Sequence, residues 1–87
     1  MSVDHDSIKA NDLLVEGKRL YDAASYEEAV ASYDKAIEIK PKFVDVWNSK
    51  GEALRVLKKY EEAVASFDKA IEIDPKNAAT WMSKELY

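Results

Sequence analysis

The 87-residue chain has no cysteine, a single histidine, and only two glycines and two prolines. Without cysteine, neither a disulfide framework nor thiolate chemistry is possible. No apolar run approaches the roughly 20 residues that a membrane span needs. The N-terminus also has neither the basic region nor the apolar core of a signal peptide. We therefore expect a soluble protein of the cytoplasm.

A surplus of positive charge is also missing. The net charge is −4, from 13 basic and 17 acidic residues that are interleaved along the chain. Proteins that bind nucleic acid normally carry a basic stripe, because neutralising phosphates supplies much of their affinity. We therefore expect neither nucleic acid nor a membrane as a partner. With 47% apolar and 34% charged residues, the composition is that of one small globular domain.

Groups suited to catalysis or metal binding are scarce as well. The adjacent pairs Glu27-Glu28 and Glu61-Glu62 are expected to point apart on a helix, whereas catalytic carboxylates converge. Asp4-His5-Asp6 is a faint metal-ligand pattern in a tail that we expect to fray. No serine, lysine or aspartate has an evident basic partner for nucleophilic catalysis. We predict no catalytic residue, no metal site and no cofactor, and thus a protein that is not an enzyme.

What the sequence does contain is an internal repeat. Residues 10–43 align with residues 44–77 at an offset of 34 without a gap, and 17 of the 34 positions are identical. The matches are concentrated from Tyr26 to Phe43, where 15 of 18 positions agree. From Ala10 to Ser25 only 2 of 16 agree. Each unit therefore has a nearly fixed second half and a variable first half.

Apolar residues recur at intervals of three and four in both halves of each unit, which indicates helices. We predict helices at about 8–23, 26–39, 43–57, 60–73 and 77–86. Ser25 and Glu28 form a capping-box signal at the start of a second helix, whereas the equivalent Lys59 has no such signal. Pro41 and Pro75 end the second helices.

These elements predict an all-α solenoid of two antiparallel helix hairpins plus a C-terminal partial-repeat helix. The expected boundaries are a flexible N-terminal tail at 1–7 and a single domain at 8–87. Within that domain, repeat 1 covers 10–43, repeat 2 covers 44–77 and the terminal helix covers 78–87.

The repeat has a helix–turn–helix period of 34 residues, a tryptophan followed four residues later by glycine, and a proline at the end of the unit. In these features it resembles the tetratricopeptide repeat. The second unit matches through Trp47, Gly51, Leu54, Tyr60, Ala63, Phe67, Ala70 and Pro75. The first unit matches through Leu13, Gly17, Leu20, Tyr26, Ala29, Tyr33, Ala36 and Pro41. The departures are Glu16 and Lys50, where the family usually has leucine, and Leu13, where it usually has tryptophan.

The two glycines need a physical reason, because glycine inside a helix costs about 1 kcal/mol relative to alanine. Gly17 and Gly51 occupy the same phase of the repeat. We predict that they allow the ring of Tyr33 or Phe67, or a neighbouring backbone, to approach the first helix of each unit.

The resemblance implies that the first helices line a concave groove for peptides or partner proteins, as in a scaffold or adaptor. Variability in the first halves fits a recognition surface, although an unconstrained solvated face would vary too. The expected groove residues are Asn11, Leu14, Lys18, Tyr21 and Asp22, then Asp45, Asn48, Glu52 and Arg55, then Met82 with Leu86. Among these, Leu14, Tyr21 and Met82 are candidate apolar anchors. Lys18 and Arg55 are suited to a partner carboxylate, which Glu52 would oppose.

One subclass of the family grips the acidic C-terminal tails of chaperones through a carboxylate clamp. The resemblance would then require lysine at Leu14, asparagine at Lys18 and Ser49, and basic residues at Ala79 and Ser83. None of these is present, so docking of chaperone tails is not expected.

A third unit begins at the C-terminus and stops at Tyr87. The residues that would face its missing second helix are apolar, and Ile8, Leu14 and Val15 make the N-terminal face partly apolar. Since exposed apolar patches usually mark interaction sites, the alternative to partner binding is self-association, as a dimer or by end-to-end stacking. The residues assigned to it are Trp81, Met82, Leu86 and Tyr87. A third possibility is that the chain is a fragment of a longer array.

Overall fold

The computed structural model describes residues 5–76, and these residues form four helices. The helices are α1 (His5–Asp22), α2 (Tyr26–Ile39), α3 (Val44–Val56) and α4 (Tyr60–Ile73). No strand occurs in this part of the chain, so the predicted all-α class is confirmed. Every helix bound lies within three residues of its predicted position, with the largest difference at the start of α1. The helix predicted at 77–86 lies outside the described residues.

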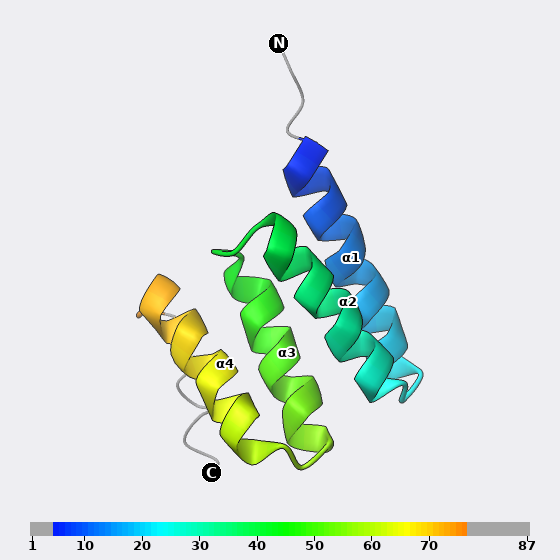
Figure 1. Ribbon diagram of the computed structural model, residues 1–87, viewed down its shortest axis with the longest axis vertical. Coiled ribbons are helices and arrows are strands. Elements are labelled where there is room, and N and C mark those ends of the chain that lie inside the picture. The colour runs from blue at the N-terminus through cyan, green and yellow to red at the C-terminus, as the bar shows by residue number, and fades with distance from the viewer. Residues whose placement is uncertain (1–4, 77–87) are drawn as a thin grey trace.

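The helices form two antiparallel hairpins that stack side by side (Figure 1). The first hairpin consists of α1 and α2, and the second consists of α3 and α4. The hairpins meet mainly where α2 packs against α3, and a smaller contact joins α1 to α3. This arrangement places the variable first helices of the two units next to each other.

Both hairpins turn in the same way although their turn sequences differ. Ala24 and Lys58, at equivalent positions of the repeat, each have a φ of 64°. The following amides of Ser25 and Lys59 donate to carbonyls five residues back, at N···O distances of 2.8 and 2.9 Å. This is the pattern that commonly closes a helix through one left-handed residue. The hairpin geometry therefore imposes a positive φ on residues that have a side chain.

The predicted capping box at the start of α2 is wrong. Ser25 is the N-cap residue, but its side chain makes no capping hydrogen bond. Lys59, which cannot cap in this way, has nearly the same backbone dihedral angles, with ψ of 68° against 67° for Ser25. Because α2 and α4 begin identically with and without a capping side chain, the turn and the helix packing set where they start.

The core of each hairpin is built from small residues on the second helix around one large ring. Tyr33 is 1% exposed and Phe67 is fully buried. A Cβ atom placed on Gly17 would lie 2.6 Å from Cδ1 of Tyr33, and one on Gly51 would lie 2.7 Å from Cζ of Phe67. Both separations are far below van der Waals contact. The predicted close approach of these rings to the first helices is confirmed.

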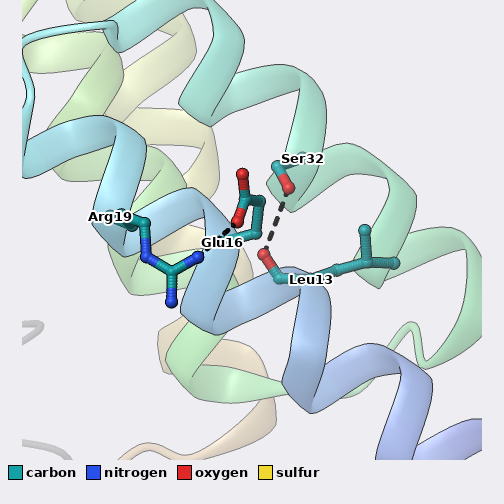
Figure 2. Close-up of polar contacts among 4 residues, drawn as sticks. All are labelled: Leu13, Glu16, Arg19 and Ser32. Carbon is teal, nitrogen blue, oxygen red and sulfur yellow. Dashed lines mark hydrogen bonds and ion pairs between the residues drawn. The ribbon is translucent and has the colours of Figure 1, made fainter.

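Three polar contacts further join the helices and the turn between the hairpins. In the first hairpin, the buried Ser32 hydroxyl of α2 donates to the Leu13 carbonyl oxygen of α1 at 3.2 Å (Figure 2). Between hairpins, Lys50 of α3 pairs with Asp34 of α2 at 2.6 Å. Trp47 Nε1 donates to the Pro41 carbonyl oxygen at 2.8 Å, which ties α3 to the turn that precedes it. The contacts of Lys50 and Trp47 help to fix how the second hairpin lies on the first.

Candidate functional site

The two first helices border a hollow of about 260 Å³ that extends over both hairpins. Its lining residues are Lys18, Tyr21, Asp22, Tyr33, Ser49 and Glu52. On α1, the three lining residues are spaced by three and four positions, and on α3 the two lining residues are spaced by three. Such spacing places side chains on one face of a helix. The stacking of the hairpins then brings the two faces together.

Two tyrosines give the hollow an aromatic surface. Tyr33 of α2 is almost fully buried, and its hydroxyl forms a side-chain hydrogen bond with Ser49 of α3. The Tyr21 ring stacks edge-to-face on Tyr26, with ring centroids 5.2 Å apart and an interplanar angle of 76°. Tyr21 is therefore held in place by a neighbouring ring and is half-buried at the border of the hollow.

Both phenols stay neutral at physiological pH. Burial raises the pKa of Tyr33 to about 12, although its hydrogen bond with Ser49 acts in the opposite direction. Burial also raises the pKa of Tyr21, and the negative charge of Glu52 raises it further, whereas the positive charge of Arg55 lowers it. Each neutral hydroxyl can in principle donate and accept a hydrogen bond.

The charges around the hollow are mixed. Its lining contains one cation, Lys18, and two anions, Asp22 and Glu52. Glu52 is already paired with Arg55 one turn further along α3. This pair is partly shielded from solvent, since the two side chains are 30% and 35% exposed. The site therefore has no excess of positive charge that would attract a strongly acidic ligand.

The structure brings together four of the predicted groove residues, namely Lys18, Tyr21, Asp22 and Glu52. Arg55 lies beside them through its pair with Glu52. Asn11 and Asp45 are exposed and Asn48 is half-buried, and these three do not line the hollow. Met82, Trp81, Leu86 and Tyr87 lie outside the described residues, so their assigned roles stay predictions.

Leu14 corrects the sequence analysis. It was expected to be an exposed anchor, but it is only 7% exposed and belongs to the core cluster with Ala29, Tyr33 and Val46. Its side chain is held among α1, α2 and α3, so it is not available to a ligand. The residues of α1 that match the family, Leu13, Gly17 and Leu20, do lie on the packed face of the helix, and that face also includes Leu14.

Two lining residues were not predicted for the groove. Tyr33 was assigned to packing alone, and Ser49 was considered only as a clamp position. A signal was present in the repeat itself, because Tyr33 differs from the equivalent Phe67 by one hydroxyl group. A polar atom at a core position in one unit but not the other indicates a local polar partner, which is Ser49.

Two other hollows lie within single hairpins. One of about 530 Å³ is bordered by Lys9, Asp12, Leu13, Lys35, Glu38 and Ile39. The other, of about 320 Å³, is bordered by Trp47, Lys50, Leu54, Glu62, Ala65, Ser66 and Lys69. Neither of them combines the variable first helices of both units. The hollow between α1 and α3 is therefore the better candidate for recognition.

Residues 5–76 contain no group of three or more His, Asp or Glu side chains placed to hold a metal ion. Among the same residues, no helix is both long enough and apolar enough to cross a membrane.

Comparisons with known proteins agree with this architecture. A family model described as tetratricopeptide repeat matches residues 14–78. The chain is similar to the TPR2B domain of yeast Sti1, solved as a complex with pHsp70, at a TM-score of 0.86 and 30% identity. That match covers 88% of this chain and 62% of the Sti1 chain, so the protein spans less than two thirds of that domain structure.

A second solved structure shows likeness of fold alone. It is the first TPR of Spaghetti (RPAP3) bound to the HSP90 peptide SRMEEVD, at a TM-score of 0.58 and 18% identity. The match covers 92% of this chain and 90% of that one. No curated protein matches the chain.

Proposed function

The chain belongs to the tetratricopeptide repeat family, and on this basis we propose that it is a non-catalytic interaction module that binds a peptide segment of a partner protein in the hollow between α1 and α3. The observation that supports this most directly is the composition of the hollow. Five of its six lining residues come from the variable first helices, while the sixth, Tyr33, comes from the nearly fixed second helix.

The shape and chemistry of the hollow suit an extended peptide. Small binding sites are typically concave and largely apolar, with a few polar groups that fix orientation. Here the half-buried ring of Tyr21 offers apolar surface, and the hydroxyls of Tyr21 and Ser49 offer hydrogen bonds, while Tyr33 is almost fully buried, in contact with Ser49. Lys18 on one side and Glu52 on the other provide charges of both signs for side chains of the peptide.

The similar solved domains were captured with chaperone peptides, which raises the question of whether this chain binds the same ligands. The peptide SRMEEVD carries three acidic side chains and a C-terminal carboxylate. In this chain, Leu14 is buried where a clamp would place lysine, and Asp22 and Glu52 border the hollow. These features favour a peptide that is neutral or of mixed charge over a strongly acidic tail.

Selection from a random peptide library, followed by NMR titration of the labelled protein, tests the proposal. We expect the selected peptides to shift the amide signals of Lys18, Tyr21, Ser49 and Glu52. Tyr21→Ala should weaken binding about tenfold or more, since a buried aromatic contact typically contributes over 1 kcal/mol to an interface. Tyr60→Ala, which removes a tyrosine that is 48% exposed on α4, is the matched control.

A second variant and a comparison of peptides distinguish this site and ligand class from the alternatives. Because Tyr21 also packs on Tyr26, Lys18→Glu serves as a second variant that leaves the core intact, with Lys35→Glu on α2 as its charge-matched control. The peptide SRMEEVD should bind more weakly than the selected peptides. Binding of that peptide as tight as theirs would show that acidic tails are the preferred ligands. Shifts confined to the other hollows would refute the proposed site.

A further inference from the structure

The hollow between α1 and α3 contains an anion without a partner in the described part of the chain. Asp22, the last residue of α1, borders the hollow and is exposed. Among residues 5–76, none of the ion pairs involves Asp22. Glu52, the other anion of the lining, is paired with Arg55. Once that pair is set aside, Asp22 and the cation Lys18 are the two charges that the hollow can offer to a ligand.

The fold of the hairpin does not require an acid at position 22. The equivalent residue of the second unit is Val56, which ends α3. The turns that follow have the same geometry, since Ala24 and Lys58 both have a φ of 64°. A carboxylate is also unfavourable at the C-terminal end of a helix, because the helix carries a partial negative charge there. Neither the turn nor the helix accounts for Asp22, whereas a positively charged ligand does.

An aromatic ring lies next to this carboxylate. Tyr21 borders the same hollow, half-buried, and its ring is held by an edge-to-face contact with Tyr26. The pKa values of Tyr21 and Tyr33 are raised mainly by burial, and the negative charge of Asp22 raises both of them further. The Asp22 carboxylate therefore acts on both phenols of the hollow. Since the face of an aromatic ring attracts cations, the ring and the carboxylate favour the same kind of group.

We propose that Asp22 and the ring of Tyr21 form a subsite for an arginine side chain of the ligand, which rests on the proposed binding of a peptide in this hollow. A guanidinium group is planar, and it can donate two parallel hydrogen bonds to a carboxylate and also stack on an aromatic ring. A lysine ammonium group is a compact charge without this fit. The subsite therefore prefers arginine to lysine.

Lys18 limits how much positive charge the peptide can carry. It lies one turn before Asp22 on α1 and borders the same hollow. Like Asp22, it takes part in none of the ion pairs of residues 5–76. Its charge repels a second cation near the subsite, so a run of basic residues is disfavoured. The expected ligand is a peptide with one arginine at Asp22 and with neutral or acidic side chains towards Lys18.

NMR titration of the labelled protein with N-acetyl-arginine methylamide tests the subsite. N-acetyl-citrulline methylamide, in which a neutral urea group of nearly the same shape replaces the guanidinium group, is the matched probe. At low ionic strength, where charges are screened least, we expect the arginine compound to shift the amide signals of Tyr21 and Asp22 saturably at millimolar concentration. The citrulline compound should leave these signals in place. Equal shifts from both compounds, or no shift of these signals by the arginine compound, would overturn the proposal.

Substitutions show which side chains bind the arginine compound. Asp22→Asn should weaken its binding about threefold, as expected for the loss of an exposed ion pair. Asp22→Val, which copies the second unit, should act in the same way, and so should Tyr21→Leu, which keeps an apolar side chain without a ring. Lys18→Ala should strengthen binding, because it removes a like charge.

The control for the lost charge is Asp12→Asn. It removes the same carboxylate charge from an exposed position of α1 that does not line the hollow, and it should leave binding of the arginine compound unchanged. If Asp12→Asn and Asp22→Asn weaken binding equally, the compound is attracted only by the net negative charge of the protein, and the proposed subsite is refuted.

The random peptide library separates the subsite from the proposed function. Peptides selected on the wild type should be enriched in arginine, and peptides selected on Asp22→Asn should lose that enrichment. The peptide SRMEEVD cannot replace the library here, because it contains an arginine as well as three acidic side chains. Selected peptides that bind in the hollow without arginine would refute the subsite and leave the proposed function intact. A library without binders, together with saturable binding of the arginine compound at Tyr21 and Asp22, would refute the proposed function and support the subsite.

Discussion

At the scale of single residues, one hydroxyl group distinguishes the two hairpin cores. Tyr33 and Phe67 occupy equivalent positions, and both are buried against a glycine of the first helix. Phe67 shows that the position accepts a ring without a hydroxyl. The Tyr33 hydroxyl instead reaches Ser49 at the border of the hollow. Each core ring therefore fills the same space, and only the first also takes part in the candidate site.

The buried phenol predicts that stability depends on pH in the alkaline range. The pKa of Tyr33 is raised from 10.0 to about 12 in the folded protein, mainly by burial. Folding therefore favours the neutral phenol, and this contribution is complete below pH 10 and is lost as the pH rises through 12. We expect the loss to amount to about 2 kcal/mol in the free energy of unfolding.

The measurement is urea denaturation between pH 8 and pH 12, with Tyr33→Phe as the control. The difference between wild type and Tyr33→Phe reports on this residue alone. The stability of the wild type should fall more steeply than that of the variant. Parallel curves would mean that Tyr33 ionises as readily in the folded state as in the unfolded one.

Residue-scale prediction from the sequence succeeded where a pattern had a single physical cause. A glycine within a helix has a cost, so its recurrence at one phase of the repeat indicated a close contact, and the rings of Tyr33 and Phe67 make it. Leu14 failed because neighbouring positions on a helix differ by about 100° in direction. The apolar periodicity of a short helix does not fix the direction of its buried face more closely than this angle. The burial of Leu14 therefore follows only from the position of α3.

At the scale of elements, the bounds of the four described helices were predictable because three independent signals agreed. The apolar spacing, the prolines after α2 and α4, and the repeat itself all place the helices in the same register. The cap at Ser25 could not be predicted, since the sequence shows a suitable side chain but not the geometry that competes with it. The candidate site depends on contacts between α1, α2 and α3. On α1 the sequence pointed to Lys18, Tyr21 and Asp22, which line the hollow, but also to Asn11 and Leu14, which do not. It did not point to Tyr33 of α2.

The turns lead to a stability prediction for the hairpins. Lys58 has a φ of 64°, and this left-handed conformation costs residues with a side chain roughly 1 kcal/mol, whereas glycine adopts it freely. We expect Lys58→Gly to raise the free energy of unfolding by about 1 kcal/mol, and Ala24→Gly to do the same in the first hairpin. Thermal and urea denaturation followed by circular dichroism measure this gain.

The neighbouring lysine serves as the control for the turn. Lys59 has a φ of −90°, so glycine there relieves no strain, and Lys59→Gly should give no gain in stability. A gain equal to that of Lys58→Gly would show that the turn is not strained at position 58 and that removal of a positive charge explains the effect.

At the scale of the whole molecule, the junction between α2 and α3 decides whether the two hairpins behave as one domain. A hairpin pair of this size has a small core, and repeat proteins derive much of their stability from the contacts between neighbouring units. Val46 and Ala53 of α3 are fully buried in that contact here, whereas Asp12 and Arg19, at the equivalent positions of α1, are exposed. The same helix position is therefore buried at the junction on α3 and exposed on α1.

Exchanging one residue between these two positions tests this difference directly. Val46→Asp puts at the junction the residue that α1 carries at the surface, and it buries a carboxylate among apolar groups of α2, where the nearby cation, Lys50, is already paired with Asp34. We expect a loss of about 3 kcal/mol or more in the free energy of unfolding, with the two hairpins no longer unfolding together. The reverse change, Asp12→Val, alters an exposed position and should shift stability by less than about 0.5 kcal/mol. Urea denaturation monitored by tryptophan fluorescence, to which Trp47 and Trp81 contribute, and by helical circular dichroism separates these outcomes, because the two signals diverge when the hairpins uncouple. Equal effects of the two substitutions would show that burial at the junction does not hold the hairpins together. The difference between Val46 on α3 and Asp12 on α1 would then have no role in the contact between the hairpins.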